Sequence, residues 1–109
     1  METASILIAD RSSAIRGRRA VATVLDSVAG TIRSGAGAGR VQFPPDVAFD
    51  ALLAQTCGGR PAGPTIAFFP NGMSCGGTVG LRRGSVGYQI RVNWLTGGVE
   101  ILPAGEAAR

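Results

Sequence analysis

The feature that most constrains the fold is a period-two alternation of apolar and polar side chains between residues 86 and 94. Apolar side chains recur at every second position, with glycine or polar residues between them; they are Val86, Tyr88, Ile90, Val92 and Trp94. This pattern is typical of a β-strand with one buried face and one face in water. A Thr-Gly-Gly turn follows, and Val99 and Ile101 resume the pattern. We therefore expect an antiparallel hairpin in which Tyr88 or Trp94 is largely buried.

Alternating segments also precede this hairpin. Residues 65–69 and 78–83 read as strands, and the first is followed by a Phe-Pro-Asn-Gly sequence typical of a tight turn. Residues 65–102 are therefore expected to form one antiparallel sheet of about four strands. Residues 20–34 show a shorter version of the same pattern, which predicts a separate hairpin.

Residues 2–17 have the pattern of an amphipathic helix. Its apolar side chains fall on one stripe, which consists of Ala4, Leu7, Ile8, Ala14 and Ile15. A helix of about four turns is marginal alone, so we expect its Leu7, Ile8 and Ile15 face to pack on the sheet. The pattern begins abruptly at Met1, which suggests a truncated helix. The predicted fold class is α+β, with an N-terminal helix packed on antiparallel sheets built from hairpins.

Residues 34–64 have weak periodicity and many Gly and Pro residues. The Gly-rich stretch 34–40 is expected to be flexible, and it does not match a phosphate loop because Arg40 replaces the third glycine. Specificity often lies on loops that a rigid scaffold carries, so the apolar side chains of Val47, Phe49 and Leu52 are candidate partner-binding residues. The region also fits a mobile connection without a role, or an extra edge strand.

The missing residue types exclude most enzyme classes. The 109 residues include no His, and all eleven basic residues are Arg. A Ser-His-Asp triad, a Cys-His pair, a histidine zinc site and a lysine Schiff base are therefore impossible. Ser74 and Cys75 follow a sharp turn and are candidate nucleophiles, but no His or Lys can act as their base. We expect a protein that is not an enzyme, with no catalytic residues, cofactor or metal.

A net charge of +4 raises the question of nucleic-acid binding. Arg82, Arg83 and Arg91 lie on or beside the last expected strands, where they could contact phosphates. A stacking platform for bases could be built from Phe68, Phe69, Tyr88 and Trp94. Scattered charges are usually just solvated, and Tyr88 and Trp94 are in register with core-forming side chains. Nucleic acid is therefore not expected as a partner.

Three segments carry a resemblance to a known family. Residues 14–21 read Ala-Ile-Arg-Gly-Arg-Arg-Ala-Val. Residues 66–72 read Ile-Ala-Phe-Phe-Pro-Asn-Gly, and Gly-Gly-Thr-Val-Gly-Leu follows at 76–81. Residues 88–99 contain the alternating strand and the Thr-Gly-Gly turn. In this order, the segments resemble the post-helix region, the central motifs and the final hairpin of GspH-type pseudopilins in the GspH/FimT pilin-like family.

The resemblance covers residues 6–33 and 65–102 but not the region between them. It implies that residues 1–109 are one periplasmic domain of a structural minor pseudopilin of the bacterial type II secretion system. Such a protein assembles at or near the tip of the pseudopilus and supports export of folded proteins across the outer membrane. Its implied partners are the other minor pseudopilins and the major pseudopilin, and it has no small-molecule substrate.

Pseudopilins of this type begin with a prepilin peptidase site and a long hydrophobic helix, which anchors them in the inner membrane as single-pass proteins. On this interpretation, residues 2–17 are the remaining half of that helix. The apolar run at residues 4–9 is far shorter than the roughly 20 residues that span a bilayer. A FimT- or FimU-type minor pilin of type IV pili shares the fold and is the alternative, with DNA contact through arginines.

The periplasmic location that the resemblance implies also bears on the two cysteines. The periplasm is oxidising, and two cysteines in a small domain there are expected to pair. A Cys57–Cys75 disulfide would tether the irregular middle region to the sheet and contribute about 3 kcal/mol in the chain-entropy model. The alternative is two separate thiols, one of them buried as a small apolar side chain.

Overall fold

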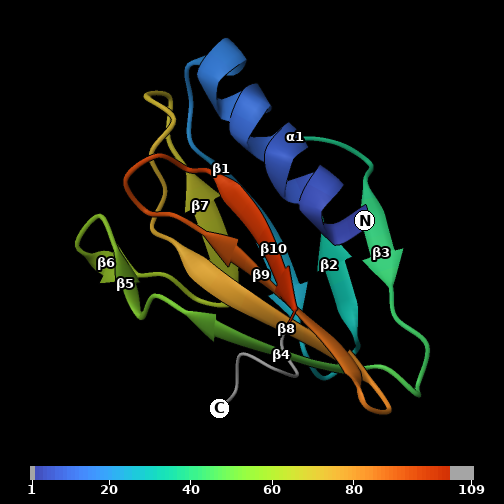
Figure 1. The fold of residues 1–109 in the computed structure, drawn as a ribbon. Coiled ribbons are helices and arrows are strands. Elements are labelled where there is room, and N and C mark those ends of the chain that lie inside the picture. Colours follow the sequence, from blue (N-terminus) through green and yellow to red (C-terminus); the bar gives the residue numbers. More distant parts are fainter. Residues whose placement is uncertain (1, 104–109) are drawn as a thin grey trace.

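The computed structural model describes residues 2–103, and these form a helix and ten strands (Figure 1). The predicted α+β class, with an N-terminal helix packed on antiparallel sheets, is confirmed. In chain order the elements are α1 (Glu2–Gly17), β1 (Val21–Asp26), β2 (Thr31–Arg33), β3 (Arg40–Gln42), β4 (Ala48–Leu53), β5 (Thr56–Cys57), β6 (Arg60–Pro61), β7 (Thr65–Phe68), β8 (Gly77–Arg83), β9 (Val86–Val92) and β10 (Val99–Pro103).

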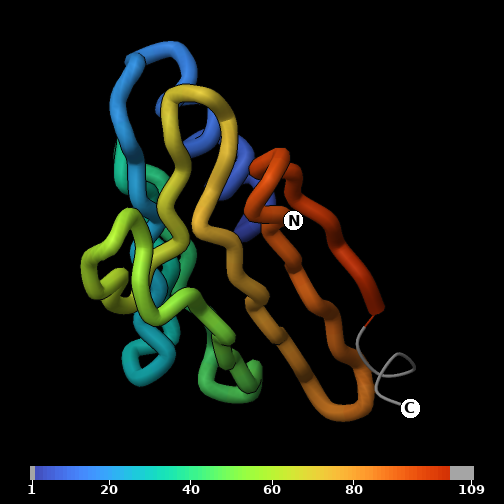
Figure 2. Tube along the Cα trace, turned by 90° about the vertical axis from the view of Figure 1, so that its left-hand side faces the viewer, coloured from blue at the N-terminus to red at the C-terminus, as the bar shows by residue number. Residues whose placement is uncertain are grey.

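Two four-stranded sheets form the body of the domain. The first has the order β3-β2-β1-β7 and the second the order β10-β9-β8-β4, with antiparallel pairing throughout. Figure 2 shows the two sheets as separate layers, with β8 to β10 on one side and β1, β2 and β7 on the other. Their inner faces bury one apolar core, which includes Ile32, Ile66, Phe68, Val79 and Ile90.

Residues 65–102 do not form the single sheet that the sequence predicted. β7 pairs with β1 of the first sheet, so that Val21 lies opposite Phe68. The chain then crosses to the second sheet, where β4 takes the fourth place by pairing with β8 from Ala48 to Leu53. Alternation shows which residues are in strands but not which strands pair. Here the turn after Phe69 connects two layers instead of two neighbouring strands.

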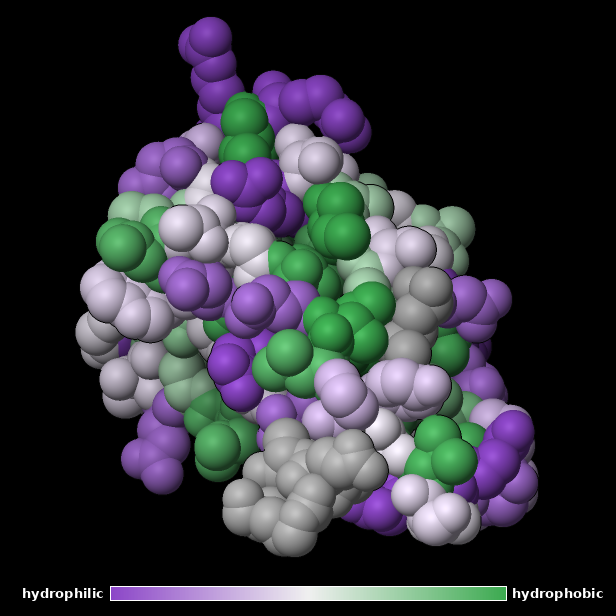
Figure 3. Space-filling model, viewed as in Figure 1, coloured by the Kyte–Doolittle hydropathy of each residue, from purple (hydrophilic) through white to green (hydrophobic). Residues whose placement is uncertain are grey.

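Helix α1 packs against β1, β3, β7 and β10. In the view of Figure 1, the surface shows apolar and polar residues interspersed (Figure 3). Leu7 is fully buried, as predicted, but Ile8 is 52% exposed and Ile15 is also exposed, so the prediction is wrong for these two residues. The buried face is centred on Leu7 and Asp10. A stripe drawn through apolar residues alone misses this face, because it counts a buried carboxylate as a surface group.

The buried Asp10 is fully provided with hydrogen-bond donors. Its Oδ2 accepts from Thr23 Oγ1 at 2.6 Å and from the backbone N–H of Gly35 at 2.9 Å, and its Oδ1 accepts from Ser34 Oγ at 2.5 Å. Ser34 Oγ in turn accepts from the N–H of Gly37 at 3.0 Å. The Gly-rich stretch that we expected to be flexible is therefore tied to the helix at its start.

The two large aromatic side chains expected in the core lie near its margins. Ile90 and Val92 are buried, but Tyr88 is 42% and Trp94 is 61% exposed, so the predicted burial is wrong for both. Trp94 lies beyond the end of β9, in the turn that leads to β10. Tyr88 shares its strand face with Ile90, but it lies nearer the β8–β9 turn, where the core ends.

Residues 34–64 contain more regular structure than their composition suggested. β3 extends the first sheet, β4 forms an edge of the second, and β5 and β6 form a small separate hairpin. Of the alternatives for this region, an extra edge strand describes β4. In the structure a disulfide joins Cys57 of that hairpin to Cys75, with the Cα atoms 5.8 Å apart.

Candidate functional site

The candidate nucleophiles both have structural roles. The Ser74 hydroxyl donates to the carbonyl of Ala67 at 2.6 Å and accepts from the N–H of Gly76 at 3.0 Å. Cys75 is bonded to Cys57. Within residues 2–103, no three Cys, Asp or Glu side chains are grouped so that they could hold a metal ion. Ser74 and Cys75 therefore shape the connection between β7 and β8.

The residues considered for nucleic acid do not form one surface. Phe68 is fully buried between the sheets, so it cannot stack on a base. Arg82 and Arg91 lie on the outer face of the second sheet, opposite Gly87 and Thr78. Arg83 faces the other way and forms an ion pair with Asp46 at 3.0 Å. This arrangement lacks the stripe of neighbouring cations that a phosphate backbone requires.

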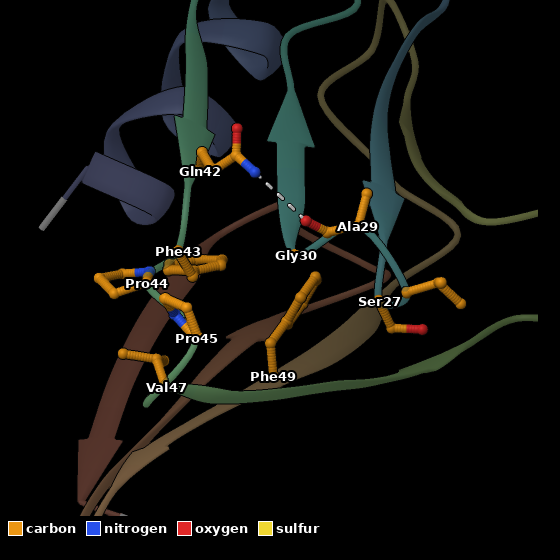
Figure 4. Close-up of a pocket in the computed structure, with 10 residues that line it drawn as sticks. Ser27, Ala29, Gly30, Gln42, Phe43, Pro44, Pro45, Val47 and Phe49 are labelled. Carbon is orange, nitrogen blue, oxygen red and sulfur yellow. Dashed lines mark hydrogen bonds between the residues drawn. The ribbon is translucent and has the colours of Figure 1, made fainter.

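The predicted partner-binding region contains an open pocket of about 550 Å³ (Figure 4). The β1–β2 turn forms one wall, and the segment from β3 to the start of β4 forms the other. Its lining residues are Ser27, Val28, Ala29, Gly30, Gln42, Phe43, Pro44, Pro45, Val47 and Phe49. Figure 4 shows Phe49 and Phe43 directed into the space between these walls.

Local sequence chemistry explains the first wall. Asp26 follows the last apolar residue of β1, and its Oδ1 accepts from the N–H groups of Val28 at 3.0 Å and Ala29 at 2.9 Å. Gly30 has φ of 70°, a left-handed conformation that glycine adopts without steric cost. This tight turn leaves the Val28 side chain 97% exposed at its tip.

The second wall is held in place by hydrogen bonds and by aromatic packing. The Phe43 N–H donates to the Gly30 carbonyl at 2.8 Å, and Gln42 Nε2 donates to the Ala29 carbonyl at 3.5 Å. The rings of Phe43 and Phe49 are 5.2 Å apart at an angle of 54°, a favourable tilted arrangement. The wall is therefore set before any partner binds.

The structure separates the three predicted partner-binding residues. Val47 and Phe49 line the pocket, but Leu52 lies on the outer face of β4 and is 77% exposed. Successive side chains of a strand point to opposite faces, so Phe49 and Leu52, which are three positions apart in β4, lie on different faces. Sequence reasoning missed the contributions of Val28 and Phe43, and the Pro44-Pro45 pair was the available signal for a rigid wall.

The pocket can bind apolar groups but has little capacity for catalysis. None of its ten lining residues is charged, and the side chains of Ser27 and Gln42 are its polar groups. An apolar side chain could fill the space beside Phe43 and Phe49, and Gln42 could hydrogen-bond to a backbone. This combination suits a protein contact better than an anionic or metal-bound ligand.

The fold matches solved structures of pilin-like proteins. It is similar to the minor pseudopilin EpsH from the type 2 secretion system of Vibrio cholerae, with a TM-score of 0.71 and 10% identity, covering 93% of this chain and 90% of that chain. A second EpsH structure gives 0.69 and 10% identity, covering 94% and 89%. The type IV minor pilin FimU of Pseudomonas aeruginosa gives 0.63 and 14% identity, covering 92% and 86%.

These likenesses show that the chain has the GspH-like pilin fold that its motifs implied. The sequence itself matches no protein-family model, and no curated protein sequence matches it closely enough to count as a relative. Within residues 2–103, α1 is too short and too polar to cross a membrane.

Proposed function

We propose that this chain is the periplasmic domain of a structural minor pseudopilin of a type II secretion system, without catalysis of its own. The observation that carries the proposal is the fold likeness to EpsH, which extends over 93% of this chain. The motifs at residues 66–72 and 76–81 support it independently, because they resemble GspH-type pseudopilins in sequence.

In this role, α1 connects the domain to the rest of the pseudopilus. We propose that α1 continues a hydrophobic helix that anchors the protein in the bacterial inner membrane and later packs in the filament. The domain then joins the other minor pseudopilins near the tip, next to the major pseudopilin, and supports protein export. Asp10 suits this arrangement because it fixes the helix to β1 and to the loop at residues 34–37.

The pocket in Figure 4 is the proposed contact with a neighbouring subunit. Its walls are fixed by hydrogen bonds, its lining is uncharged, and Val28 extends from its rim into solvent. Covering such apolar surface gives a protein contact its favourable free energy. The outer face of the second sheet carries Arg82 and Arg91 and is the less suitable surface for a closely packed contact.

The proposal is tested by affinity capture with purified periplasmic domains of the other pseudopilins from the same bacterium. The domain should retain at least one minor pseudopilin, and Val28→Ser combined with Val47→Ser should weaken that binding by about tenfold. Leu52→Ser is the matched control, because Leu52 is more exposed than Val47 but lies outside the pocket. Capture of no pseudopilin domain would contradict the proposed function.

The fold likeness to FimU favours a minor type IV pilin as the second candidate. The same capture experiment separates the two functions when it includes the periplasmic domains of the type IV minor pilins. Retention of these domains, and not of the type II pseudopilins, would support the second candidate. Deletion of the gene should abolish protein secretion in the first case and twitching or pilus assembly in the second.

A further inference from the structure

Arg11 joins three segments of the chain at the end of the domain where α1 ends. Its Nε donates to the carbonyl of Gly72, in the β7–β8 connection, at 3.2 Å, and to the carbonyl of Thr96, in the β9–β10 turn, at 3.1 Å. Figure 1 shows both loops beside α1 at this end of the molecule. The guanidinium is therefore held in one position relative to both loops.

The two loops fit closely around this side chain. Gly72 has φ of 89° and Gly97 has φ of 70°, left-handed conformations that glycine adopts without steric cost. A Cβ at Gly97 would lie 2.7 Å from Arg11 Nε, and a Cβ at Gly72 would lie 2.9 Å from Arg11 Nη2. A larger residue at either position would displace the guanidinium, so both glycines are needed to hold Arg11 as it is.

The terminal nitrogens of this fixed guanidinium are uncommitted. Within residues 2–103, neither Nη1 nor Nη2 of Arg11 forms a hydrogen bond or an ion pair. A guanidinium whose Nε is occupied still offers its two Nη groups as a pair, which matches the two oxygens of a carboxylate. Because the side chain is already positioned, binding would cost little further entropy.

The surroundings of Arg11 are positively charged. Three further exposed arginines follow it at the end of α1, and together with Arg11 they are called the basic end: Arg16, Arg18 and Arg19. None of the four forms an ion pair with another described residue. Figure 3 shows hydrophilic side chains projecting from this end of the molecule. Residues 11–25 and 65–99, which include the three segments that meet at Arg11, contain no Asp or Glu.

The carboxylates nearest to these segments in the sequence do not neutralise the basic end. Asp10 precedes Arg11 but is buried, and its oxygens accept from neutral donors. Glu100 follows the β9–β10 turn, but it lies on the outer face of the second sheet, opposite Arg91. The charge of this end therefore selects a partner that brings its own carboxylates.

Arg18 gives an independent observation, because it occupies a position that favours glycine. The Arg19 N–H donates to the Ala14 carbonyl at 3.3 Å, as in the C-terminal cap of a helix whose left-handed residue is Arg18. Arg18 has φ of 53° and is the one non-glycine residue with positive φ within residues 2–103. The chain has its glycine one position too early, at Gly17. A cation is thus present where it costs stability, as is common at functional sites.

We propose that the basic end binds an acidic segment of a neighbouring protein, with one carboxylate paired with the Nη groups of Arg11. The other three arginines attract further carboxylates of the same segment. Apolar side chains favour a protein over a nucleic acid as the partner. Ile15 is 39% exposed, and its Cδ1 approaches Gly72 as Arg11 does. Arginine beside apolar and aromatic side chains is typical of protein contacts, and Trp94 and Leu95 are exposed in the turn that binds Arg11.

This surface is separate from the pocket in Figure 4. The basic end precedes the start of β1, whereas the pocket begins after its last residue, Asp26. A strand of six residues places these two points roughly 20 Å apart. The inference therefore goes beyond the proposed function and does not rest on the contact assigned to the pocket.

The test is a titration of a short dye-labelled peptide, in which glutamate alternates with leucine, with the 109-residue chain. Fluorescence anisotropy should show saturable binding that weakens as the salt concentration rises. Arg11→Gln should weaken this binding about fivefold, as for a well-oriented ion pair. Arg82→Gln is the matched control and should weaken it less than twofold. It removes the same charge from an exposed arginine at the other end of β9 from the turn that binds Arg11.

A second variant separates binding from stability. In Arg18→Gly, glycine relieves the left-handed conformation, so the melting temperature should stay the same or rise. Its affinity for the peptide should nevertheless fall about threefold, because an exposed cation is lost. This variant keeps the test valid even if Arg11→Gln unfolds the domain by releasing the two loops.

Four results would overturn the inference. They are no saturable binding of the glutamate peptide, equal binding of a peptide with lysine in place of glutamate, equal weakening by Arg82→Gln and Arg11→Gln, or wild-type affinity of Arg18→Gly. Tighter binding of short single-stranded DNA than of the peptide would also overturn it, because nucleic acid would then be the partner. Capture of pseudopilin domains is measured separately, so failure of the peptide to bind while capture succeeds leaves the proposed function intact.

Discussion

The carboxylate of Asp10 accepts a hydrogen bond from Thr23 Oγ1 at 2.6 Å, and this contact joins α1 to β1, a central strand of the first sheet. Both side chains are buried. The same carboxylate accepts from Ser34 and Gly35, so one side chain fixes the helix, a strand and a loop relative to one another. Its three donors are neutral, and the network meets the requirement that buried polar groups find partners.

Replacing Asp10 is expected to destabilise the domain by about 2–3 kcal/mol. Asp10→Ala leaves the buried Thr23 hydroxyl without its acceptor, and the part-buried Ser34 hydroxyl and Gly35 N–H lose theirs as well. Asp10→Asn keeps one acceptor oxygen and should cost less. Urea denaturation monitored by circular dichroism gives the free energies of unfolding.

Glu100→Ala is the control for the Asp10 variants, because Glu100 is an exposed carboxylate on β10. Its free energy of unfolding should lie within about 0.5 kcal/mol of the wild type. If Asp10→Ala and Glu100→Ala had equal effects, the Asp10 network would have no structural importance.

Substitution by alanine should affect stability differently at two glycines of the loop at 34–40. A Cβ at Gly35 would collide with the backbone of Ala22, whereas a Cβ at Gly37 would meet nothing within 4 Å. Gly35→Ala should therefore lower the free energy of unfolding by about 2–3 kcal/mol, and Gly37→Ala should be neutral. Thermal melts of the two variants provide the measurement, and similar melting temperatures would contradict the close packing of this loop.

The sequence predicted the fold class well because alternation and helical spacing are local properties. The strand beginning at Val86 and the helix ending at Gly17 follow from local spacing alone, although the predicted alternation continued through Trp94 and the strand ends at Val92. The pairing of β7 with β1 does not, since it depends on contacts between residues such as Val21 and Phe68 that are far apart in the chain. Likewise, the burial of Asp10 depends on donors that only the folded chain brings together.

The candidate site was predictable only in part for a related reason. Apolar residues in an irregular region, here Val47 and Phe49, pointed to the segment that lines the pocket, and partner binding there stays a prediction. Which side of the segment each one faces depends on the alternation of side chains along β4, and Leu52, three positions after Phe49, faces away from the pocket. Val86 and Tyr88 continue the alternation of the buried residues Ile90 and Val92. Their exposure follows from the length of the opposite sheet, and the sequence around Val86 and Tyr88 does not encode that length.

Helix α1 should depend on Leu7 far more than on Ile8. Leu7 is fully buried, so Leu7→Ala removes packed methyl groups and should cost about 3 kcal/mol. Ile8 is half exposed, so Ile8→Asp should cost about 1 kcal/mol or less, because its carboxylate reaches water. Urea denaturation would contradict this orientation of the helix if the Ile8 variant were the less stable of the two.

Residues Phe49 and Leu52 should contribute differently to stability. Phe49 is partly buried and packs on Phe43 and the core, so Phe49→Ala should cost about 2 kcal/mol. Leu52 lies on the outer face, and Leu52→Ser should change stability by less than about 0.5 kcal/mol. Thermal melts measure both effects, and a larger loss for Leu52→Ser would show that β4 is paired in the other register.

The Cys57–Cys75 disulfide should stabilise the domain through its position between two separate elements. It ties the β5–β6 hairpin to the connection between β7 and β8, across 18 positions of sequence. Closing a loop of this size contributes about 3 kcal/mol in the chain-entropy model, so reduction should lower the melting temperature by roughly 10 °C or more. The double variant Cys57→Ser, Cys75→Ser is the control, because reductant should not change its melting temperature. Thiol titration of denatured, unreduced wild-type protein should find no reactive thiol, and two reactive thiols there would contradict the bridge.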